Sequence, residues 1–571
     1  MNIIKKIFKF LYLEQWVIVS IVFIILYSCA NWGLPTKERI SALLGNGTVQ
    51  LSELQLQLLD KTNRKKVKIA KKKYLSKSSD FQRVPDNTPG LFSKMDMLYA
   101  FQDFIVYSSA VDEMKTYNAL RKIKPKQLQF DPQEFRYGGV YLYFVGFLLF
   151  LAKLSGIIVT SHNLNFYLNH PEYISKMIII GRIPGIISYM GILFLLARFG
   201  RLLKNRATGS LAMIMFLGSS VCFNQSLVSK PHIFATFLAL LAVYLLFIGK
   251  TNKSHTYMNM GVVTCGLAMG TSIILAISAT FIISFVFDMN NLLISSKRII
   301  KYGLLMIAVF FMSNPYVLIN HEAFLATFTN HASGSYDYGV IKFYKLLLFW
   351  NKLIISFSPL TTVIGLFSAI FIAIKSKKNL ARLAIGFMLV LFTTGLFIPV
   401  PRLYSYIGPF LALFAAIGLI SLYDTVRFLP RILKHTLIGL SITSSLIFFF
   451  LISYEMIFDN TWLKSTKEFI EQTNFTKNIL IGFSHRPHPI KMQPLPFLNV
   501  QAVDLKKYHN THILPDYIVV YDNWRAWKDH PLRNKYKLFT SLNDNTSYKI
   551  LNKWRVRSLS TYPRSSVYIR I

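Results

Sequence analysis

Apolar stretches separated by short polar segments dominate the chain between Trp16 and Phe458. Each stretch is roughly twenty residues long, which is the length that an α-helix needs to cross about 30 Å of hydrocarbon. The pattern therefore predicts a polytopic α-helical membrane protein with about 11 transmembrane helices. The predicted spans lie at residues 12–34, 139–160, 176–199, 207–228, 231–249, 258–287, 302–319, 343–374, 383–400, 402–422 and 436–458.

Basic residues before the first span orient the chain. Lys5, Lys6 and Lys9 precede that span, and lysines and arginines favour the cytoplasmic side of a membrane. We therefore expect the N-terminus in the cytoplasm. Residues 35–138 then form a long first loop outside the membrane, and residues 459–571 lie outside as well. No cleavable signal is evident, because the first apolar run is long and has no small-residue cleavage pattern after it.

Two arrangements of the middle spans are possible. Simple alternation puts the basic segments 198–206 and 250–253 on the outer side, against the positive-inside tendency. In a second arrangement, one of the runs at 139–160 and 176–199 lies along the outer surface, and residues 258–287 make two short crossings. The second arrangement brings the basic connections inside. Both arrangements leave the N-terminus inside and the C-terminal segment outside.

The pattern changes after residue 458. Residues 462–473 have the spacing of an amphipathic helix, and the short runs NILIGF, YIVVYD and SVYIRI are typical of strands. We therefore predict two domains, a transmembrane domain at residues 1–458 and a small extracytoplasmic α/β domain at residues 459–571. A segment of this size can hold a modest core of its own.

Composition agrees with a membrane protein. The 571 residues are 53% hydrophobic and only 16% charged, and mean hydropathy is +0.40. The net charge of +38 is better explained by lysines and arginines that meet anionic lipid than by nucleic acid, so we expect membrane lipids and no nucleic acid as partners. The cysteines Cys29, Cys222 and Cys265 all lie in apolar runs, which gives no disulfide framework.

The polar first loop holds an adjacent pair of acids, Asp112 and Glu113. Neighbouring residues do not face each other on a helix or turn, so the pair is not a two-carboxylate hydrolase site. One acid can face a cavity and accept a proton from a hydroxyl or amine, while the other holds the backbone or a cation. Two solvated loop acids are the alternative interpretation.

Several cations and aromatic residues lie where polar segments meet apolar runs. Arg136 and Tyr137 precede Gly138 and the second run, Lys230 and His232 lie in a very short hairpin, and Arg402 opens a late span. A guanidinium at the end of a membrane helix is well suited to a lipid-borne phosphate. Arg136 could instead reach the interface as a snorkelling side chain, and Lys230 and His232 could be interfacial anchors.

No cofactor is firmly indicated. The chain has no P-loop, no GxGxxG after a strand and no HExxH motif. His485 and His488 are a weak metal signal, because no cysteine or carboxylate accompanies them. We assign no metal ligands, although a divalent metal stays open.

The order of these motifs resembles the GT-C glycosyltransferases, in particular the branch of protein O-mannosyltransferases and aminoarabinose-lipid-A transferases. The resemblance covers residues 12–458 and extends to a C-terminal outer domain like that of several bacterial members. It is carried by the acid pair in the first outer loop, Lys230-Pro231 after an early span, Asn314-Pro315-Tyr316 at the end of a middle span, and the segment from Arg402 to Pro409. The chain departs from the pattern at His232, where these enzymes have an acid, and Glu38 lies closer to the first span than the acid pair does.

The resemblance implies an inverting sugar transfer from a polyprenyl-phosphate donor to a glycan, lipid or protein acceptor outside the plasma membrane. Asp112 would deprotonate or orient the acceptor with support from Glu113. Arg402, Lys230 and Arg136 would bind the donor phosphate. The alternatives are a flippase for a lipid-linked glycan and an O-antigen polymerase or ligase. Transporters typically have inverted repeats and mid-membrane charges, and neither is clear in this sequence.

Overall fold

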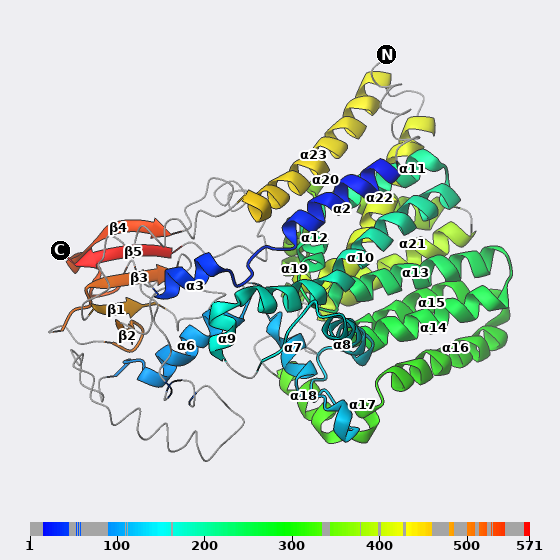
Figure 1. The fold of residues 1–571 in the computed structure, drawn as a ribbon. Coiled ribbons are helices and arrows are strands. Elements are labelled where there is room, and N and C mark those ends of the chain that lie inside the picture. Colours follow the sequence, from blue (N-terminus) through cyan, green and yellow to red (C-terminus); the bar gives the residue numbers. More distant parts are fainter. Residues whose placement is uncertain are drawn as a thin grey trace.

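The apolar runs form a bundle of helices in the computed structural model, and a small sheet lies beyond one end of the bundle (Figure 1). The structure describes residues 15–44, 53, 55, 58, 89–108, 110, 112–161, 164–333, 343–376, 378–397, 401–425, 430–458, 479–484, 500–508, 513–521, 527, 529–542 and 565–570. The predicted amphipathic helix at 462–473 lies outside these residues.

The first half of the chain contains α2 and the helices of the first loop, followed by the long helices of the bundle. Their bounds are α2 Gln15–Cys29, α3 Lys37–Leu44, α6 Lys94–Val106, α7 Met114–Leu120, η1 Pro125–Gln127, α8 Gly139–Leu154, α9 Leu164–Asn169, α10 Pro171–Leu203, α11 Arg206–Leu217, α12 Ser220–Ser226, α13 His232–Thr251, α14 His255–Thr271, η2 Ile273–Ser278 and α15 Ala279–Val286.

The second half completes the bundle and then forms the sheet. Its elements are η3 Met289–Asn291, α16 Leu292–Ser313, α17 Tyr316–Ile319, α18 His321–Ser333, α19 Phe343–Ser356, α20 Pro359–Lys375, α21 Lys378–Phe397, η4 Pro401–Ile407, α22 Gly408–Thr425, α23 Arg431–Phe458, β1 Ile479–Phe483, β2 Val500–Asp504, β3 Tyr517–Tyr521, η7 Arg533–Lys535, β4 Tyr536–Leu542 and β5 Ser565–Arg570.

The helices identify a multi-pass membrane protein. Among the described residues, five helices are long and apolar enough to cross a membrane: α10, α13, α21, η4 with α22, and α23. The bent pair α11–α12, with an angle of 76° between its helices, makes a sixth if it is one span. Shorter apolar helices include α2, α8, α20 and the η2–α15 segment. The number of crossings stays a prediction.

Contacts between distant residues show which helix ends lie together. Lys204, between α10 and α11, pairs with Asp424 near the end of α22 at 2.9 Å. Asn379, near the start of α21, donates to the Thr251 hydroxyl at the end of α13 at 3.3 Å. We call this the basic end of the bundle, because basic connections share it. They lie at residues 198–206, 250–255, 295–301 and 378–382.

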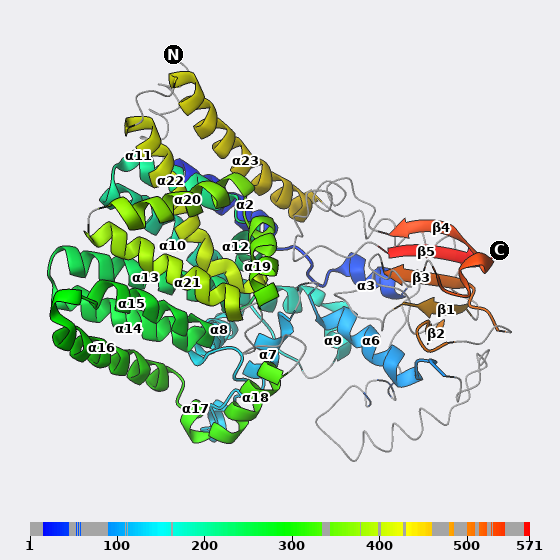
Figure 2. The same ribbon diagram turned by 180° about the vertical axis from the view of Figure 1, so that it is seen from behind.

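The opposite end, which we call the site end, faces the sheet (Figures 1 and 2). Here Gly138, before α8, donates to the Thr271 carbonyl at 3.0 Å, and Ser229, before α13, donates to the Glu113 carboxylate at 2.7 Å. Because α14 runs from the basic end to Thr271 and α15 returns, the predicted long span at 258–287 is two short helices. This agrees with the second arrangement of the spans.

Helix α8 differs in direction from its neighbours. It is seen nearly along its axis in Figure 1, whereas α10, α13 and α14 run across the picture. Of the two runs at 139–160 and 176–199, α10 is therefore the one that traverses the bundle. The predicted single span at 343–374 is corrected, because it divides into α19 and α20. Pro359 opens α20 and disfavours helical geometry at the preceding residue, which has ψ 127°.

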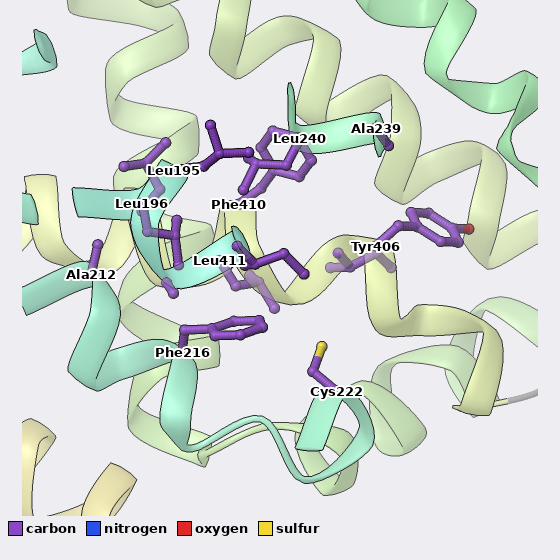
Figure 3. Packing of buried hydrophobic residues seen from close by; sticks show 14 of the residues in the cluster. Leu195, Leu196, Ala212, Phe216, Cys222, Ala239, Leu240, Tyr406, Phe410 and Leu411 are labelled. Carbon is purple, nitrogen blue, oxygen red and sulfur yellow. The ribbon is translucent and has the colours of Figure 1, made fainter. Parts of the chain in front are cut away.

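The core of the bundle is apolar and closely packed. Leu195 and Leu196 of α10, Phe216 of α11, Leu240 of α13 and Leu411 of α22 are shielded from solvent, as Figure 3 shows from close by. Side chains from four helices thus meet in one cluster. Dense packing of this kind resists small displacements and holds the helix ends in place.

The sheet has five strands in the order β2-β1-β3-β5-β4. Strands β1, β2 and β3 are parallel, whereas β5 pairs antiparallel with β3 and β4. The strands predicted from NILIGF, YIVVYD and SVYIRI correspond to β1, β3 and β5. Strands β2 and β4 were not predicted, because polar residues interrupt their apolar alternation.

The first loop covers the outer edge of the sheet. Leu91 bridges antiparallel to Val503 of β2, Phe92 N–H donates to the Ala502 carbonyl at 2.9 Å, and Asp504 N–H donates to the Gly90 carbonyl at 2.7 Å. Gly90 has φ +85°, a conformation that glycine adopts without a steric penalty. Residues from the first loop and the C-terminal segment therefore lie on the same side of the bundle.

This arrangement predicts the accessibility of single cysteines in intact cells. The native cysteines are all buried, so background labelling is expected to be low. A membrane-impermeant maleimide should label Asp529→Cys, in the C-terminal domain, and should leave Lys297→Cys, at the basic end, unlabelled until the cells are opened. Labelling of Lys297→Cys in intact cells would contradict the predicted orientation.

Candidate functional site

A buried ion pair joins the loop before α7 to helix α10. The Glu113 carboxylate and the Arg182 guanidinium are both fully buried. Arg182 Nε donates to Glu113 Oε1 at 2.9 Å, and Nη2 donates to Oε2 at 2.8 Å. Such bidentate, charge-assisted pairs are among the strong hydrogen bonds of proteins. The Ser229 N–H and the Ser108 hydroxyl also donate to Glu113, so both carboxylate oxygens are occupied.

The same arginine fastens the end of α2. Arg182 Nη1 donates to the carbonyls of Ala30 at 2.7 Å and Trp32 at 2.8 Å. One guanidinium thus links α2, the first loop and α10, and Glu113 adds the hairpin before α13. Because neither oxygen of Glu113 is open to a substrate, we assign Glu113 a positioning role.

Asp112 is placed differently from its neighbour. Its side chain is 24% exposed and pairs with Lys115 Nζ at 2.8 Å. Its φ of 62° lies in the left-handed region, which aspartate tolerates better than most residues. The Tyr137 hydroxyl donates to the Asp112 carbonyl oxygen at 3.4 Å and so ties this turn to the segment before α8. The two acids therefore have separate surroundings, and only Asp112 is accessible.

The hairpin before α13 packs against this loop. Thr116 Oγ1 donates to the Ser229 carbonyl at 2.7 Å. Lys230, which follows, is only 3% exposed, and His232 begins α13. The His232 ring meets the Tyr137 ring edge-on, with centroids 6.5 Å apart. The structure thus brings together the predicted site residues of the first loop and of the hairpin.

The start of α8, the end of α14 and the end of α16 meet beside Tyr137. The Gly139 N–H donates to Asn314 Oδ1 at 2.6 Å, and Asn314 Nδ2 donates to the Gly270 carbonyl at 3.1 Å. A Cβ atom at Gly138 would lie 1.9 Å from that same Gly270 oxygen. Close approach of α8 to the end of α14 therefore requires glycine at position 138.

Two hollows open around these helix ends. The first is small, with a cavity volume of about 30 Å³, and is lined by Tyr137, Gly139, Tyr143, Asn314 and Tyr316 among others. It lies where the start of α8, the end of α14 and the α16–α17 connection meet. Tyrosine hydroxyls, an amide and the Glu134 carboxylate supply hydrogen-bonding groups in an otherwise apolar lining.

The second hollow is a narrow crevice with a cavity volume of about 10 Å³, between helix η4 and the hairpin before α13. It is lined by His232, Ser272, Ser405 and Tyr406 among others. Ser405 also lies 3.2 Å from the Thr236 hydroxyl of α13. Residues 230–232, the break after α14 and helix η4 are therefore neighbours in space.

Arg402 belongs to helix η4, about one turn before Ser405. The prediction that its guanidinium binds a phosphate concerns a side chain outside the described part of the structure. The position of η4 brings the backbone of this segment to the hollow at His232.

Arg136 already has a partner. Its guanidinium pairs with the Glu134 carboxylate next to the first hollow. Burial alone would raise the pKa of Glu134, but the hydrogen bonds and charge of Arg136 outweigh this and hold that pKa below its usual value. A phosphate at Arg136 would have to share the guanidinium with Glu134.

A metal would find few ligands here. Within the described residues, no group of three or more His, Cys, Asp and Glu side chains lies together. Of the acid pair, only Asp112 could contribute an oxygen, because Glu113 is taken up by Arg182. His485 and His488 lie outside the described residues.

Sequence reasoning missed Arg182 and Asn314 as organisers of the site. Arg182 is a single charge in the long apolar run MIIIGRIPGII, and an ionisable residue in a predicted span is by default a functional or structural signal. Its partner Glu113 could not be named from spacing, because the two residues come from segments far apart in the chain. Asn314 was noted as part of a motif, but its link to Gly139 and Gly270 required the fold.

No family model matches the chain, and no curated protein matches its sequence. The fold is similar to that of ArnT from Cupriavidus metallidurans bound to undecaprenyl phosphate, with a TM-score of 0.45 and 10% identity, covering 84% of this chain and 97% of that one. It is also similar to the Archaeoglobus fulgidus oligosaccharyltransferase, with a TM-score of 0.41 and 12% identity, covering 78% and 65% of the two chains.

A third similar structure is the arabinosyltransferase EmbB from Mycobacterium smegmatis, with a TM-score of 0.37 and 12% identity, covering 76% of this chain and 42% of that one. Because identities and TM-scores are low, the functional proposal rests on the residues of this chain.

Removal of the guanidinium should strongly destabilise the protein. Arg182→Ala leaves a buried carboxylate without its counter-charge, which typically costs about 3–5 kcal/mol. Denaturant unfolding in detergent measures the loss, and Arg298→Ala, an exposed arginine on α16, is the control. Replacement of both partners, as in Glu113→Leu with Arg182→Met, should recover part of the stability. Equal stability of Arg182→Ala and wild type would show that the pair does not hold the loop.

Position 138 should tolerate no larger residue. Gly138→Ala places a methyl group against the Gly270 carbonyl oxygen, so α8 and α14 must move apart. We expect a lower melting temperature and loss of ligand binding at the first hollow. Gly303→Ala is the matched control, because nothing lies within 4 Å of a Cβ there. Wild-type stability of Gly138→Ala would contradict the observed approach.

Proposed function

We propose that this chain is an integral-membrane glycosyltransferase that moves a sugar from a polyprenyl-phosphate donor to an acceptor at the outer face of the plasma membrane. One observation carries the proposal. Segments that are far apart in sequence, around Asp112, Tyr137, His232, Asn314 and Ser405, meet at the site end of the bundle. The same segments carry the GT-C motifs, and they surround two hollows beside an accessible acid.

Asp112 is the proposed general base. It accepts the proton of the acceptor hydroxyl or amine as that atom attacks the anomeric carbon, while the bond from that carbon to the donor phosphate oxygen breaks. A single displacement of this kind inverts the anomeric centre. Glu113 and Arg182 hold the turn that presents Asp112, and so fix the base relative to the hollows.

Cations stabilise the leaving phosphate in this proposal. Lys230, in the hairpin beside His232, and Arg402, in η4, come from segments that border the second hollow. Fixed positive charges in a partly dry site stabilise developing negative charge more strongly than they would in water. Tyr137 and His232 line the region between this charge and Asp112, and Arg136 is a further phosphate ligand if Glu134 shares it.

An apolar groove supports a lipid-linked donor. A third hollow, with a cavity volume of about 520 Å³, is lined by Phe130, Tyr143, Met312, Pro315 and Tyr316 among others. It shares Tyr143 and Tyr316 with the first hollow. Met312 is 81% exposed, as expected of a residue that faces lipid. A polyprenyl tail could therefore lie in this groove while its phosphate reaches the polar hollows.

The first test is sugar transfer by purified protein supplied with labelled polyprenyl-phosphate sugars and a panel of glycan, lipid and protein acceptors. Asp112→Asn should lower kcat on the order of 10²-fold or more, because it removes the base. Arg402→Ala should lower it by about 10²-fold, because it removes charge stabilisation. Glu172→Gln, an exposed acid at the start of α10, is the matched control.

Three outcomes decide between the alternatives. Loss of transfer in both variants, with folding unchanged, supports the assigned roles. Full activity of Asp112→Asn would move the base elsewhere, with Glu38 as the next candidate. If no donor gives transfer while the protein moves a lipid-linked glycan across vesicles, the chain is a flippase. Addition and removal of a divalent metal in the same assay tests the metal requirement.

A further inference from the structure

A pocket with a cavity volume of about 170 Å³ lies between α2 and α10 at the basic end of the bundle, far from the proposed catalytic site. One part of its lining is apolar and comes from Trp16, Val19, Phe194 and Met213. The Trp16 and Phe194 rings lie 6.3 Å apart, and both side chains are exposed at the surface of the bundle. In a membrane, this part of the pocket faces acyl chains.

The other part of the lining is polar and cationic. It comes from Gln15, Arg198 and Arg201. The Arg198 guanidinium lies over the Phe194 ring, 5.1 Å from its centroid, and Arg201 Nη2 donates to Gln15 Oε1 at 3.3 Å. Gln15 is itself held, because its Nε2 donates to the Ser210 hydroxyl at 3.1 Å. Each guanidinium group is therefore held at the pocket by a neighbouring side chain, Phe194 for Arg198 and Gln15 for Arg201.

Within the described residues, no acidic side chain neutralises the positive charge of this pocket, because none forms an ion pair with Arg198 or Arg201. The nearby acid Asp424 is paired with Lys204 at 2.9 Å. Two guanidinium groups without a counter-charge form a binding site for a phosphate, which they can hold through several parallel hydrogen bonds.

The expected depth of the pocket in the membrane indicates which kind of molecule carries the phosphate. Tryptophan is enriched where hydrocarbon meets the head groups, and Trp16 lies at the basic end, beside the connections rich in lysine and arginine. The leaflet that faces such connections carries most of the anionic lipid. An apolar wall that opens to lipid, next to a cationic rim, matches an acyl chain joined to a phosphate.

We propose that this pocket binds one anionic glycerophospholipid of the cytoplasmic leaflet. Its phosphate lies between Arg198 and Arg201, and an acyl chain lies over Trp16, Val19 and Phe194. The bound lipid bridges α2 and α10, the two helices that Arg182 joins nearer to the site end. This inference is independent of the proposed transferase activity.

The test uses the full chain in zwitterionic detergent, with phosphatidylglycerol or phosphatidylcholine added. Native mass spectrometry counts retained lipid, and the melting temperature is measured alongside. Arg198→Gln with Arg201→Gln should weaken phosphatidylglycerol binding by about tenfold or more and abolish the rise in melting temperature. Lys297→Gln with Arg298→Gln removes two exposed charges at the same end and should leave both readouts unchanged.

Each of the other outcomes would overturn the proposal. Equal loss of binding in both double variants would mean that the lipid responds to overall charge and not to this pocket. Equal retention of phosphatidylcholine would remove the requirement for an anionic head group. A rise in melting temperature with inorganic phosphate as large as that with phosphatidylglycerol would identify a free anion as the ligand. The variant Arg198→Gln alone leaves the hydrogen bond from Arg201 to Gln15 intact. Lipid binding that is lost in this variant is therefore not caused by loss of that packing contact.

Discussion

The buried contact between Glu113 and Arg182 is the interaction on which the site end depends. Two opposite charges withdrawn from water are costly to separate, because neither can regain its hydration in the protein interior. This energetic cost of separation keeps the first loop, α10, the end of α2 and the hairpin before α13 in one arrangement. The hydrophobic effect alone would let these segments shift relative to one another. The packed helices supply a rigid frame, but apolar packing has no direction. The ion pair and its hydrogen bonds supply direction, and they fix the orientation of the partly exposed Asp112 beside them.

Local sequence signals predicted much of this fold. Apolar runs identified the helices of the bundle, basic connections separated its two ends, and short alternating runs marked three of the five strands. These signals succeed because they reflect transfer of side chains and charges between water and hydrocarbon, which depends on neighbouring residues only. The division of residues 343–374 into two helices was missed, although Pro359 was a local signal for it.

The candidate site was harder to predict. Asp112, Tyr137 and His232 were named from the sequence, and the fold brings their segments together. The different roles of Asp112 and Glu113 could not be read from the chain, because both are acids and only the partner decides which one is buried. That partner, Arg182, lies in another helix. Long-range pairs of this kind depend on the whole arrangement of the bundle and leave no mark in local spacing.

The antiparallel bridge between Leu91 and Val503 bears on how the protein is made. An uncovered strand edge attracts other chains, and here the first loop shields it. Synthesis runs from the N-terminus, so Leu91 leaves the ribosome long before its partner exists. The sheet and the segment that covers its edge can be completed only when the last strands have been made. A prematurely ended chain would therefore insert its helices yet display an unfinished surface, which quality-control proteases could recognise.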